Sequence, residues 1–519
     1  MKKIVNATVC IIALILFGYS AQAQFTESAS NLERIRAQSL WFFGSNNAAG
    51  LTIDGDDFAD QVALGYNHTS GDFRRPQAGE TESAIALRAD GGLRLGGGYA
   101  WGDFNFARKT NRGTQWNASL LDPFRPMPYF VADTNVSDWQ IQTYAMQMKV
   151  STPFLLNDRL ALGLNLAYRN TIGAKQMDAR ATNRFYAVHV QPGIIWRLGQ
   201  TIFIGMSGEF FNHRENYDNS ISTGAPGESV SLMRGLGFHT LGFVATGANS
   251  TVHERWSIKN LWGGELQFGT QIGNLNLLAT AGYRRKNEDM HELNTGRPKF
   301  IGTVSGFEIY TNISSTFGAN TNLNLVRLNA SMRNLEGIEY VQELDARADV
   351  RNWIVISEQT RATFDAINIQ ASYDFFRGRS ETDYAWRAGA FANFNVNQDA
   401  FIMPVGIQDI TAFSVGANAK YNWAINPRNQ LLAGVRFMHR MTLDEEFAYL
   451  GPNATAPVIT NFVRPDFDIR AMNYNLLGIE LTYSRNLQNM GFFVSGHLDY
   501  LMAGNLSRIV SSVRVGFTF

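Results

Sequence analysis

Apolar and polar residues alternate along most of the chain beyond about residue 58. Between Leu160 and Tyr168 the even positions hold four leucines and the tyrosine, whereas the odd positions hold Ala, Gly, Asn and Ala. The same period of two recurs at 262–272, 367–375, 413–423 and 512–519. Because successive side chains of a β-strand point to opposite faces, this pattern predicts strands with one apolar face.

The predicted strands are too long for an ordinary soluble sheet. They run for about 10–16 residues, whereas soluble strands average about five or six. Aromatic residues gather at their ends, as in the interfacial girdles of membrane barrels: Tyr99, Trp101, Trp139, Trp196, Trp262, Tyr283, Trp386, Tyr421 and Trp423. After residue 23 no run approaches the roughly 18 apolar residues of a membrane helix. We therefore expect an all-β chain, a transmembrane antiparallel β-barrel, rather than a soluble sandwich or propeller.

The connections between these strands alternate in length. Short ones lie at 156–158, 198–200, 272–274, 426–429 and 486–490, and long ones cover about 108–137, 215–258, 287–298, 396–410 and 441–470. This asymmetry predicts short periplasmic turns and long extracellular loops. At about 25 residues per strand with its loop, the chain allows about 18 strands, within a bracket of roughly 14–20. The region 335–365 has no readable alternation.

The first residues have the layout of a secretory signal peptide. Lys2 and Lys3 precede a mainly apolar stretch, and Ala21-Gln22-Ala23 forms a small-residue cleavage site, so we expect residues 1–23 to be removed. The only cysteine, Cys10, lies in this stretch. Residues 24–57 then precede the barrel of residues 58–519, either as a plug in the lumen or as a periplasmic helix with an extra strand. This organisation predicts the cell outer membrane as the location.

Charge and composition exclude other classes of protein. The 519 residues contain 45 Lys and Arg against 45 Asp and Glu, which argues against a nucleic-acid partner. Aromatic residues make up 12% of the chain, beside 47 glycines. Exact charge balance also argues against strong ion selectivity.

Several segments resemble known outer-membrane barrels. The end of the chain, Val513 to Phe519, is similar to the C-terminal strand that the barrel assembly machinery reads, with Phe517 and Phe519 as the assembly signal. Residues 71–76, 120–130 and the hairpin 139–168 resemble an uncharacterised barrel family of Bacteroidota-type bacteria. The resemblance covers most of residues 40–519. It implies an accessory barrel of TonB-dependent uptake systems, with a TonB-dependent receptor or a surface lipoprotein as partner beside the membrane lipids.

Charged residues on the expected lumen face are candidates for solute selection. They are Arg88, Arg94, Arg169, Arg197, Glu209, Glu265, Arg284, Lys420, Arg436 and Glu480, joined by Asp374 and Arg514. The two signs nearly balance, so the alternative is that they pair and fill the lumen, which we favour.

Two connections combine arginine, proline and aromatic residues. They contain Phe73, Arg74, Arg75, Asp122, Phe124, Arg125 and Tyr129. Proline-stiffened loops with guanidinium donors suit a ligand or partner platform. The alternative, which we favour, is that these loops fold inward and constrict the lumen.

No catalytic, metal or cofactor site emerges from the sequence. His239, His253 and His291 fall in or near long connections, without the close spacing of metal ligands. Asp444-Glu445-Glu446 near His439 suggests either a hydrolase on the barrel rim or an acidic outer loop, and we expect the loop. We therefore expect no enzyme, but a passive channel or an accessory barrel in nutrient uptake. The alternatives are the rim hydrolase and a closed structural or adhesin barrel.

Overall fold

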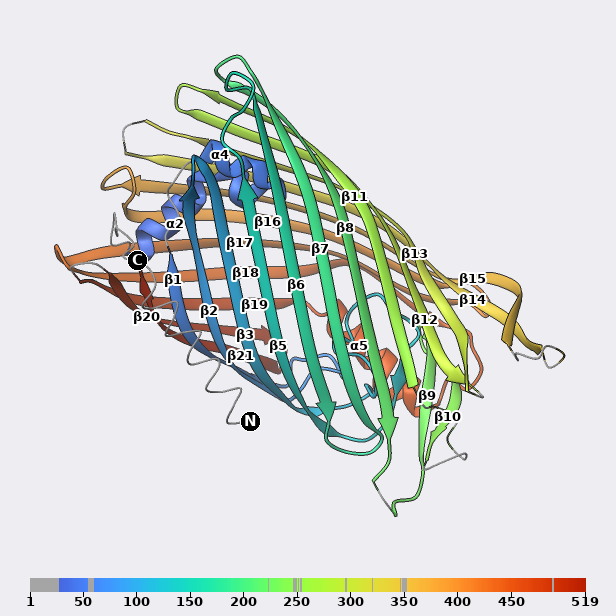
Figure 1. The fold of residues 1–519 in the computed structure, drawn as a ribbon. Coiled ribbons are helices and arrows are strands. Elements are labelled where there is room, and N and C mark those ends of the chain that lie inside the picture. Colours follow the sequence, from blue (N-terminus) through green and yellow to red (C-terminus); the bar gives the residue numbers. More distant parts are fainter. Residues whose placement is uncertain are drawn as a thin grey trace, which may run out of the picture.

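In the computed structural model, 18 strands form one closed antiparallel barrel (Figure 1). The structure describes residues 28–519 apart from 55–59, 223, 246–249, 251, 253, 295, 320, 346, 348–351 and 488–489. The first barrel strand, β1, pairs with β2 on one side and with the last strand, β21, on the other, which closes the barrel. The predicted fold class is confirmed. The expected signal peptide lies outside the described residues.

The barrel strands are long, and each pairs with its two neighbours. Their bounds are β1 Gln61–Gly71, β2 Thr81–Leu95, β3 Gly98–Thr114, β5 Ser137–Ser151, β6 Leu160–Lys175, β7 Arg180–Leu198, β8 Ile202–Ser220, β11 Glu254–Ile272, β12 Leu275–Asn294, β13 Arg297–Phe317, β14 Leu323–Asp345, β15 Asn352–Gly378, β16 Tyr384–Phe401, β17 Gly406–Asn426, β18 Asn429–Tyr449, β19 Tyr474–Asn486, β20 Gly491–Ala503 and β21 Leu506–Thr518.

An apolar outer surface follows from the period of two. Leu64 pairs with Leu87 and Val515 in the neighbouring strands, so apolar side chains lie side by side on one face. Leu266 is 63% exposed on that face, whereas Gln267 next to it is 2% exposed on the inner face. Exposed apolar and buried polar side chains are the reverse of a soluble core, and they are typical of a barrel in lipid.

The two ends of the barrel differ. At one end the connections are short, and Gly199 and Gly273 turn with φ of +71° and +57°, a conformation that glycine adopts without strain. We call this the short-turn end. The described residues of the connections 115–136, 221–253 and 450–473 lie at the opposite, long-loop end.

Two of the predicted long loops are strands. Residues 287–298 belong almost entirely to β12 and β13, and residues 396–410 to β16 and β17. These strands continue past the apolar belt, where both of their faces are polar, as at Asn287, Glu288 and Asp289. The prediction of loops there is wrong, because strands that leave the apolar belt lose their apolar alternation but keep their pairing.

The described residues of the unreadable region 335–365 belong mostly to the outer parts of β14 and β15, which form the longest hairpin of the barrel (Figure 1). Its pairing shifts register between Gly337 and Ile338 and again between Val341 and Gln342. Each bulge moves the following side chains to the other face. A simple alternation is therefore absent from the sequence, although both strands are intact.

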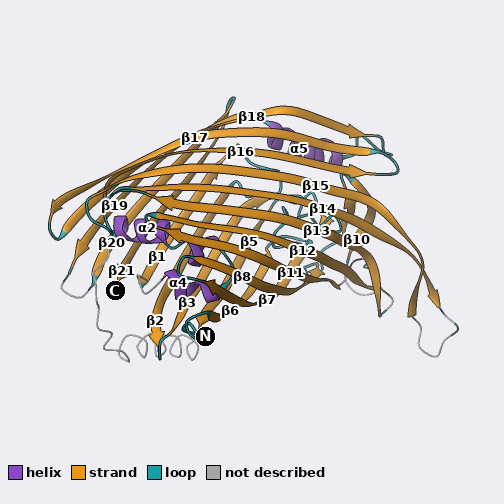
Figure 2. Cartoon of the chain, turned by 90° about the horizontal axis from the view of Figure 1, so that it is seen from above, coloured by secondary structure: helices purple, strands orange, loops and turns teal. Residues whose placement is uncertain are grey.

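Smaller elements lie at both ends of the barrel. At the short-turn end these are α2 Ala29–Gln38, α3 Leu40–Gly44, η1 Ala48–Gly50 and α4 Leu51–Asp54. At the long-loop end a three-stranded sheet contains β4 Val131–Ala132, β9 Glu228–Gly235 and β10 Phe238–Val244, beside the π-helical turn η3 Ile459–Val463 and helix α5 Arg464–Ala471. Figure 2 shows α2 and α5 in separate parts of the barrel. No helix among the described residues is long and apolar enough to cross a membrane.

Each set of small elements builds its own apolar core. Trp41 and Ala49 pack with wall residues such as Ile195 and Phe203 near the short turns. At the long-loop end a larger core includes Trp116 with η3 and the small sheet. The barrel interior is therefore filled from both ends.

Candidate functional site

The N-terminal segment, residues 28–54, lies inside the barrel near the short turns (Figure 1). Asn47 Nδ2 donates to Ile194 O of β7 at 3.0 Å, and Arg34 Nη1 donates to Asp383 O beside β16 at 3.0 Å. Further contacts reach β2, β3, β5, β6, β8, β11–β13, β15 and β17–β19. The segment therefore spans the lumen from wall to wall.

A charged group in the segment is held by the wall. Lys420 Nζ donates to Glu33 Oε1 at 2.5 Å and to Glu480 Oε1 at 2.7 Å. The Tyr384 hydroxyl donates to Glu33 Oε2 at 2.7 Å, and Arg387 lies 3.4 Å from the same oxygen. Burial opposes ionisation of Glu33, but these donors outweigh it and hold the pKa of Glu33 below its ordinary value.

The opposite side of the segment also rests on polar wall groups. Lys149 Nζ donates to Phe42 O at 2.7 Å and lies 4.4 Å from the centre of the Phe42 ring. Asn46 Nδ2 donates to Glu265 Oε1 at 2.6 Å. Much of the seat is thus made of hydrogen bonds that water can replace, rather than of apolar packing alone.

A carboxyl group is buried within the segment itself. Asp54 Oδ2 accepts a hydrogen bond of 2.6 Å from the backbone N–H of Phe42. Burial raises the pKa of Asp54 to about 7, although the N–H groups of Phe42 and Trp41 and the charge of Lys149 act in the other direction.

Glycines in the wall make room for the segment. A Cβ atom at Gly163 of β6 would overlap the backbone of Ala49, and one at Gly193 of β7 would overlap the side chain of Asn47. The backbone of the segment approaches the wall closely because these positions carry no side chain.

The ten candidate lumen residues lie on the inward faces of their strands, and several pair over a glycine. Arg284 of β12 contacts Glu209 of β8 at 2.6 Å, with Gly263 of β11 between them. Arg436 of β18 contacts Asp499 of β20 at 2.6 Å in the same way. These pairs run along the wall. A glycine on the middle strand lets two long side chains meet above it.

The remaining candidates have other partners. Arg88 contacts Asp103 at 2.9 Å, and Arg94 Nη2 donates to the Tyr99 hydroxyl at 3.1 Å. The guanidinium groups of Arg169 and Arg197 lie over aromatic rings. Glu265 accepts from the Tyr310 hydroxyl at 2.6 Å.

The structure brings the two arginine-rich connections together. Arg75 donates from Nε and Nη2 to the two carboxylate oxygens of Asp466 in α5, at 2.7 and 2.9 Å. Its guanidinium lies 4.4 Å from the centre of the Phe124 ring. Phe73 is buried against Tyr474. This fixed contact links three connections at the long-loop end.

A second arginine anchors the connection 115–136 to the wall. Arg125 forms ion pairs with Glu215 and, at 3.2 Å, with Glu288. Burial disfavours the charge of Arg125, but the two carboxylates outweigh it and hold the pKa of Arg125 above its usual value. The Tyr129 hydroxyl donates to Ile338 O at 3.0 Å. Both side chains point into the barrel, where they are bonded to wall residues.

The two remaining candidates in these connections stabilise local turns. Arg74 donates to Ala78 O at 2.8 Å and contacts Glu80 at 3.2 Å. Asp122 Oδ1 accepts from the backbone N–H of Phe124 at 3.0 Å. Both contacts shape the connection that carries them.

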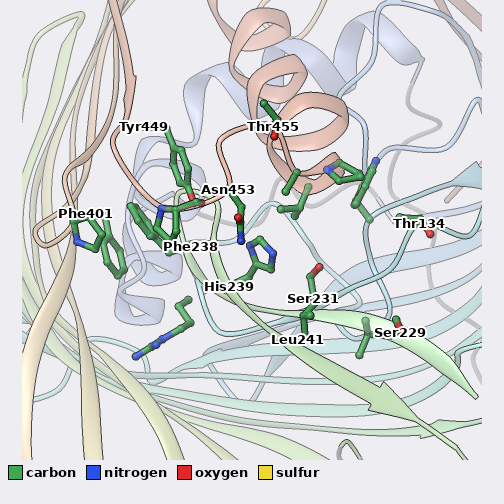
Figure 3. A pocket seen from close by; sticks show the side chains of 18 of the residues that line it. Thr134, Ser229, Ser231, Phe238, His239, Leu241, Phe401, Tyr449, Asn453 and Thr455 are labelled. Atoms are coloured by element: carbon green, nitrogen blue, oxygen red, sulfur yellow. The ribbon is translucent and has the colours of Figure 1, made fainter.

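A cavity of about 690 Å³ opens at the long-loop end, between the small sheet and the connections after β16 and β18 (Figure 3). Phe238, Phe401 and Tyr449 form one wall. His239 projects into the middle of the cavity, and its Nδ1 donates to Gly237 O at 2.8 Å. We call this the loop-end cavity.

Sequence reasoning missed the residues that complete these sites. Glu33 lies in a segment without strand periodicity, and Asp466 lies in a helix inside a connection. Their partners are hundreds of positions away, so no local spacing could have indicated them. Arg361 of the loop-end cavity falls within the unreadable region.

The sequence predicts no metal site from His239, His253 and His291. His239 lies on β10 and His291 on β12, where it stacks on Trp256, and His253 lies outside the described residues. No group of three metal-ligating side chains occurs in the described part of the chain.

The predicted acidic outer loop around Asp444 is wrong. Asp444 belongs to β18, which continues to Tyr449 because this strand also extends past the apolar belt. His439 on the same strand lies 2.9 Å from Asn475 Oδ1.

A family model matches residues 48–519. This chain belongs to a family of unknown function, DUF6850. The match includes the barrel and the last turns of the N-terminal segment. No curated protein matches the chain.

Several solved structures are similar to this chain. The ferric preacinetobactin receptor BauA from Acinetobacter baumannii is 10% identical, covers 89% of this chain and 80% of its own, and has a TM-score of 0.40. The ferric yersiniabactin uptake receptor FyuA from Yersinia pestis is 8% identical, with 89% and 80% covered and a TM-score of 0.40. The copper transporter OprC is 9% identical, with 90% and 82% covered and a TM-score of 0.41.

Proposed function

We propose that this chain is an outer-membrane transport barrel whose N-terminal segment is the gate of its lumen. The apolar outer surface supports a position in the outer membrane, with the long loops outside. The segment contacts strands around the lumen, so a solute passes only when the segment shifts.

The wall-to-wall seat of residues 28–54 carries this proposal. Many of its contacts are single hydrogen bonds and ion pairs, such as Lys149 with Phe42 O and Lys420 with Glu33. Each contact stabilises the seated segment by no more than about 3 kcal/mol, because water replaces it when the segment moves. A seat of this kind suits a part that is released and re-bound.

A gated lumen favours an accessory uptake barrel over free passive diffusion. The partner would be a TonB-dependent receptor or a surface lipoprotein in a Bacteroidota-type bacterium, acting on the segment or the loops. The barrel assembly machinery would insert the chain, reading Phe517 and Phe519. We further propose that the chain is not an enzyme.

A reversible cross-link tests the gate. Thr52 Oγ1 lies 3.1 Å from Ser151 Oγ of β5, so Thr52→Cys with Ser151→Cys places two thiols within disulfide reach. Cys10 lies in the expected signal peptide, so no other thiol competes. Conductance is recorded in a planar bilayer in mild urea, which loosens the segment before the barrel unfolds.

We expect the reduced double variant to conduct and the oxidised one to stay closed. Each single-cysteine variant should conduct with or without oxidant. Equal conductance of the oxidised and reduced forms would overturn the gate, because the path would not involve the segment. Silence of both forms up to the urea concentration that unfolds the barrel would indicate the closed structural barrel instead.

A further inference from the structure

The loop-end cavity contains an arginine placed by a β-bulge in the small sheet. Pairing between β9 and β10 steps from Gly235 with Phe238 to Met233 with His239. Arg234 is the extra residue between these two pairs and has no partner in register. Bulges re-aim side chains and are frequent beside functional sites.

The second arginine of the cavity is also an extra residue of a bulge. Pairing between β14 and β15 steps from Gly337 with Ala362 to Ile338 with Thr360, and Arg361 lies between them. A bulge in β9 and a bulge in β15 thus each place an arginine in the lining of the same cavity.

The cavity carries uncompensated positive charge. Arg234 is paired with Glu339. Arg361 donates to Met403 O at 3.4 Å, and no described carboxylate lies within ion-pair distance of it. No aspartate or glutamate is among the described residues that line the cavity.

The remaining lining contains an aromatic wall and a few uncharged polar side chains. The Phe238 ring stacks on Phe401, with ring centres 4.1 Å apart, and contacts Tyr449 at 4.8 Å. Ser231 lies apart from this aromatic wall, whereas Asn453 lies between Tyr449 and His239 (Figure 3). Asn453 has φ of +57°, a left-handed conformation that asparagine tolerates in turns.

We propose that the loop-end cavity binds a small organic anion with a flat apolar body. The anionic group would pair with Arg361 and the apolar body would lie against Phe238 and Tyr449. A cavity of about 690 Å³ is in the usual range for a ligand of drug-like size. This inference rests on the proposed function only in that the bound anion would be the solute captured before transport.

Binding is tested without any measurement of transport, so its failure differs from failure of the gate. The purified full chain in detergent is titrated with 2-naphthoate and with the neutral 2-naphthamide. Bound ligand is read by saturation-transfer NMR, after subtraction of protein-free micelles. We expect saturable binding of naphthoate, about tenfold tighter than that of the amide.

Variants separate the arginine from general charge. Arg361→Gln should weaken naphthoate binding about tenfold, and Arg361→Lys should recover part of it. Arg347→Gln is the matched control, because Arg347 is 94% exposed near the hairpin tip, and it should bind as the native chain does. A difference in gel mobility between heated and unheated samples verifies that each variant is folded.

Three results would overturn the proposal. Equal affinity for naphthoate and naphthamide would show an apolar site without anion recognition. Native affinity in Arg361→Gln would place the anion elsewhere. No saturable binding of either compound would show that the cavity takes no ligand of this class.

Discussion

Arg284 of β12 and Glu209 of β8 form an ion pair of 2.6 Å above Gly263, which belongs to the strand between them. Lys420 of β17 and Glu480 of β19 meet above Gly434 at 2.7 Å in the same arrangement. The middle glycine is what lets side chains two strands apart come into contact. Part of the glycine content of the chain therefore serves charge pairing inside the barrel.

Gly263→Val should weaken the barrel by about 1–3 kcal/mol, because a Cβ there lies 2.7 Å from Tyr283 O, 3.0 Å from Arg284 and 3.2 Å from Glu209, so it crowds the neighbouring strand and pushes the pair apart. Gly264→Val is the matched control. Its side chain would point to the lipid face, where the nearest atom is Ser207 O at 3.2 Å. Urea unfolding followed by tryptophan fluorescence gives both free energies. Equal losses in the two variants would show that backbone effects dominate.

The alternation predicts the barrel well because lipid and lumen impose opposite demands on successive residues. It fails where those demands end. The hairpin of β14 and β15 passes beyond the lipid and contains bulges, so neither face keeps a constant character. Glu33 and Asp466 could not be linked to Lys420 and Arg75, since only closure of the barrel brings these residues together.

Glu33→Gln should loosen the N-terminal segment. The change removes the negative charge that faces Lys420 and Arg387 and leaves two partly buried cations less compensated, at a cost of about 1–3 kcal/mol. We expect the lumen to conduct at a lower urea concentration than in the native chain. Arg36→Gln is the control within α2, because Arg36 is 40% exposed and lies 3.7 Å from Asp90. This pair is longer than those of Glu33 and its guanidinium is more exposed, so its loss should cost less than the loss of the Glu33 pairs.

If Glu33→Gln and Arg36→Gln both begin to conduct at the same urea concentration as the native chain, the ion pairs of Glu33 do not hold the segment in place. A lower threshold in both would point to helix α2 as a whole rather than to the carboxylate of Glu33.

Asp466→Asn should open the contact between α5 and the connection 72–80. It removes the carboxylate that accepts two hydrogen bonds from Arg75. Limited proteolysis of the connection 450–473 should then be several-fold faster. Asp468→Asn, on the same helix, removes only an exposed pair with Arg464. Its cleavage rate should match that of the native chain, and faster cleavage in it would assign the effect to the helix surface.

The seat of the N-terminal segment should depend on pH through Asp54. Its pKa of about 7 in the folded segment lies above its ordinary value of 3.8, so the folded state holds the proton more tightly. The stabilisation is complete below about pH 4 and is lost as pH rises through about 7. Glu33 acts oppositely, because its lowered pKa gives stability above its ordinary pKa that is lost in acid.

The two groups can be separated by comparing pH 6 with pH 8, where Glu33 stays ionised throughout. We expect the native chain to open its lumen at a lower urea concentration at pH 8 than at pH 6. Asp54→Asn should flatten this dependence, because the amide keeps a neutral acceptor for the Phe42 N–H at every pH. A native-like pH dependence in this variant would mean that another group controls release of the segment.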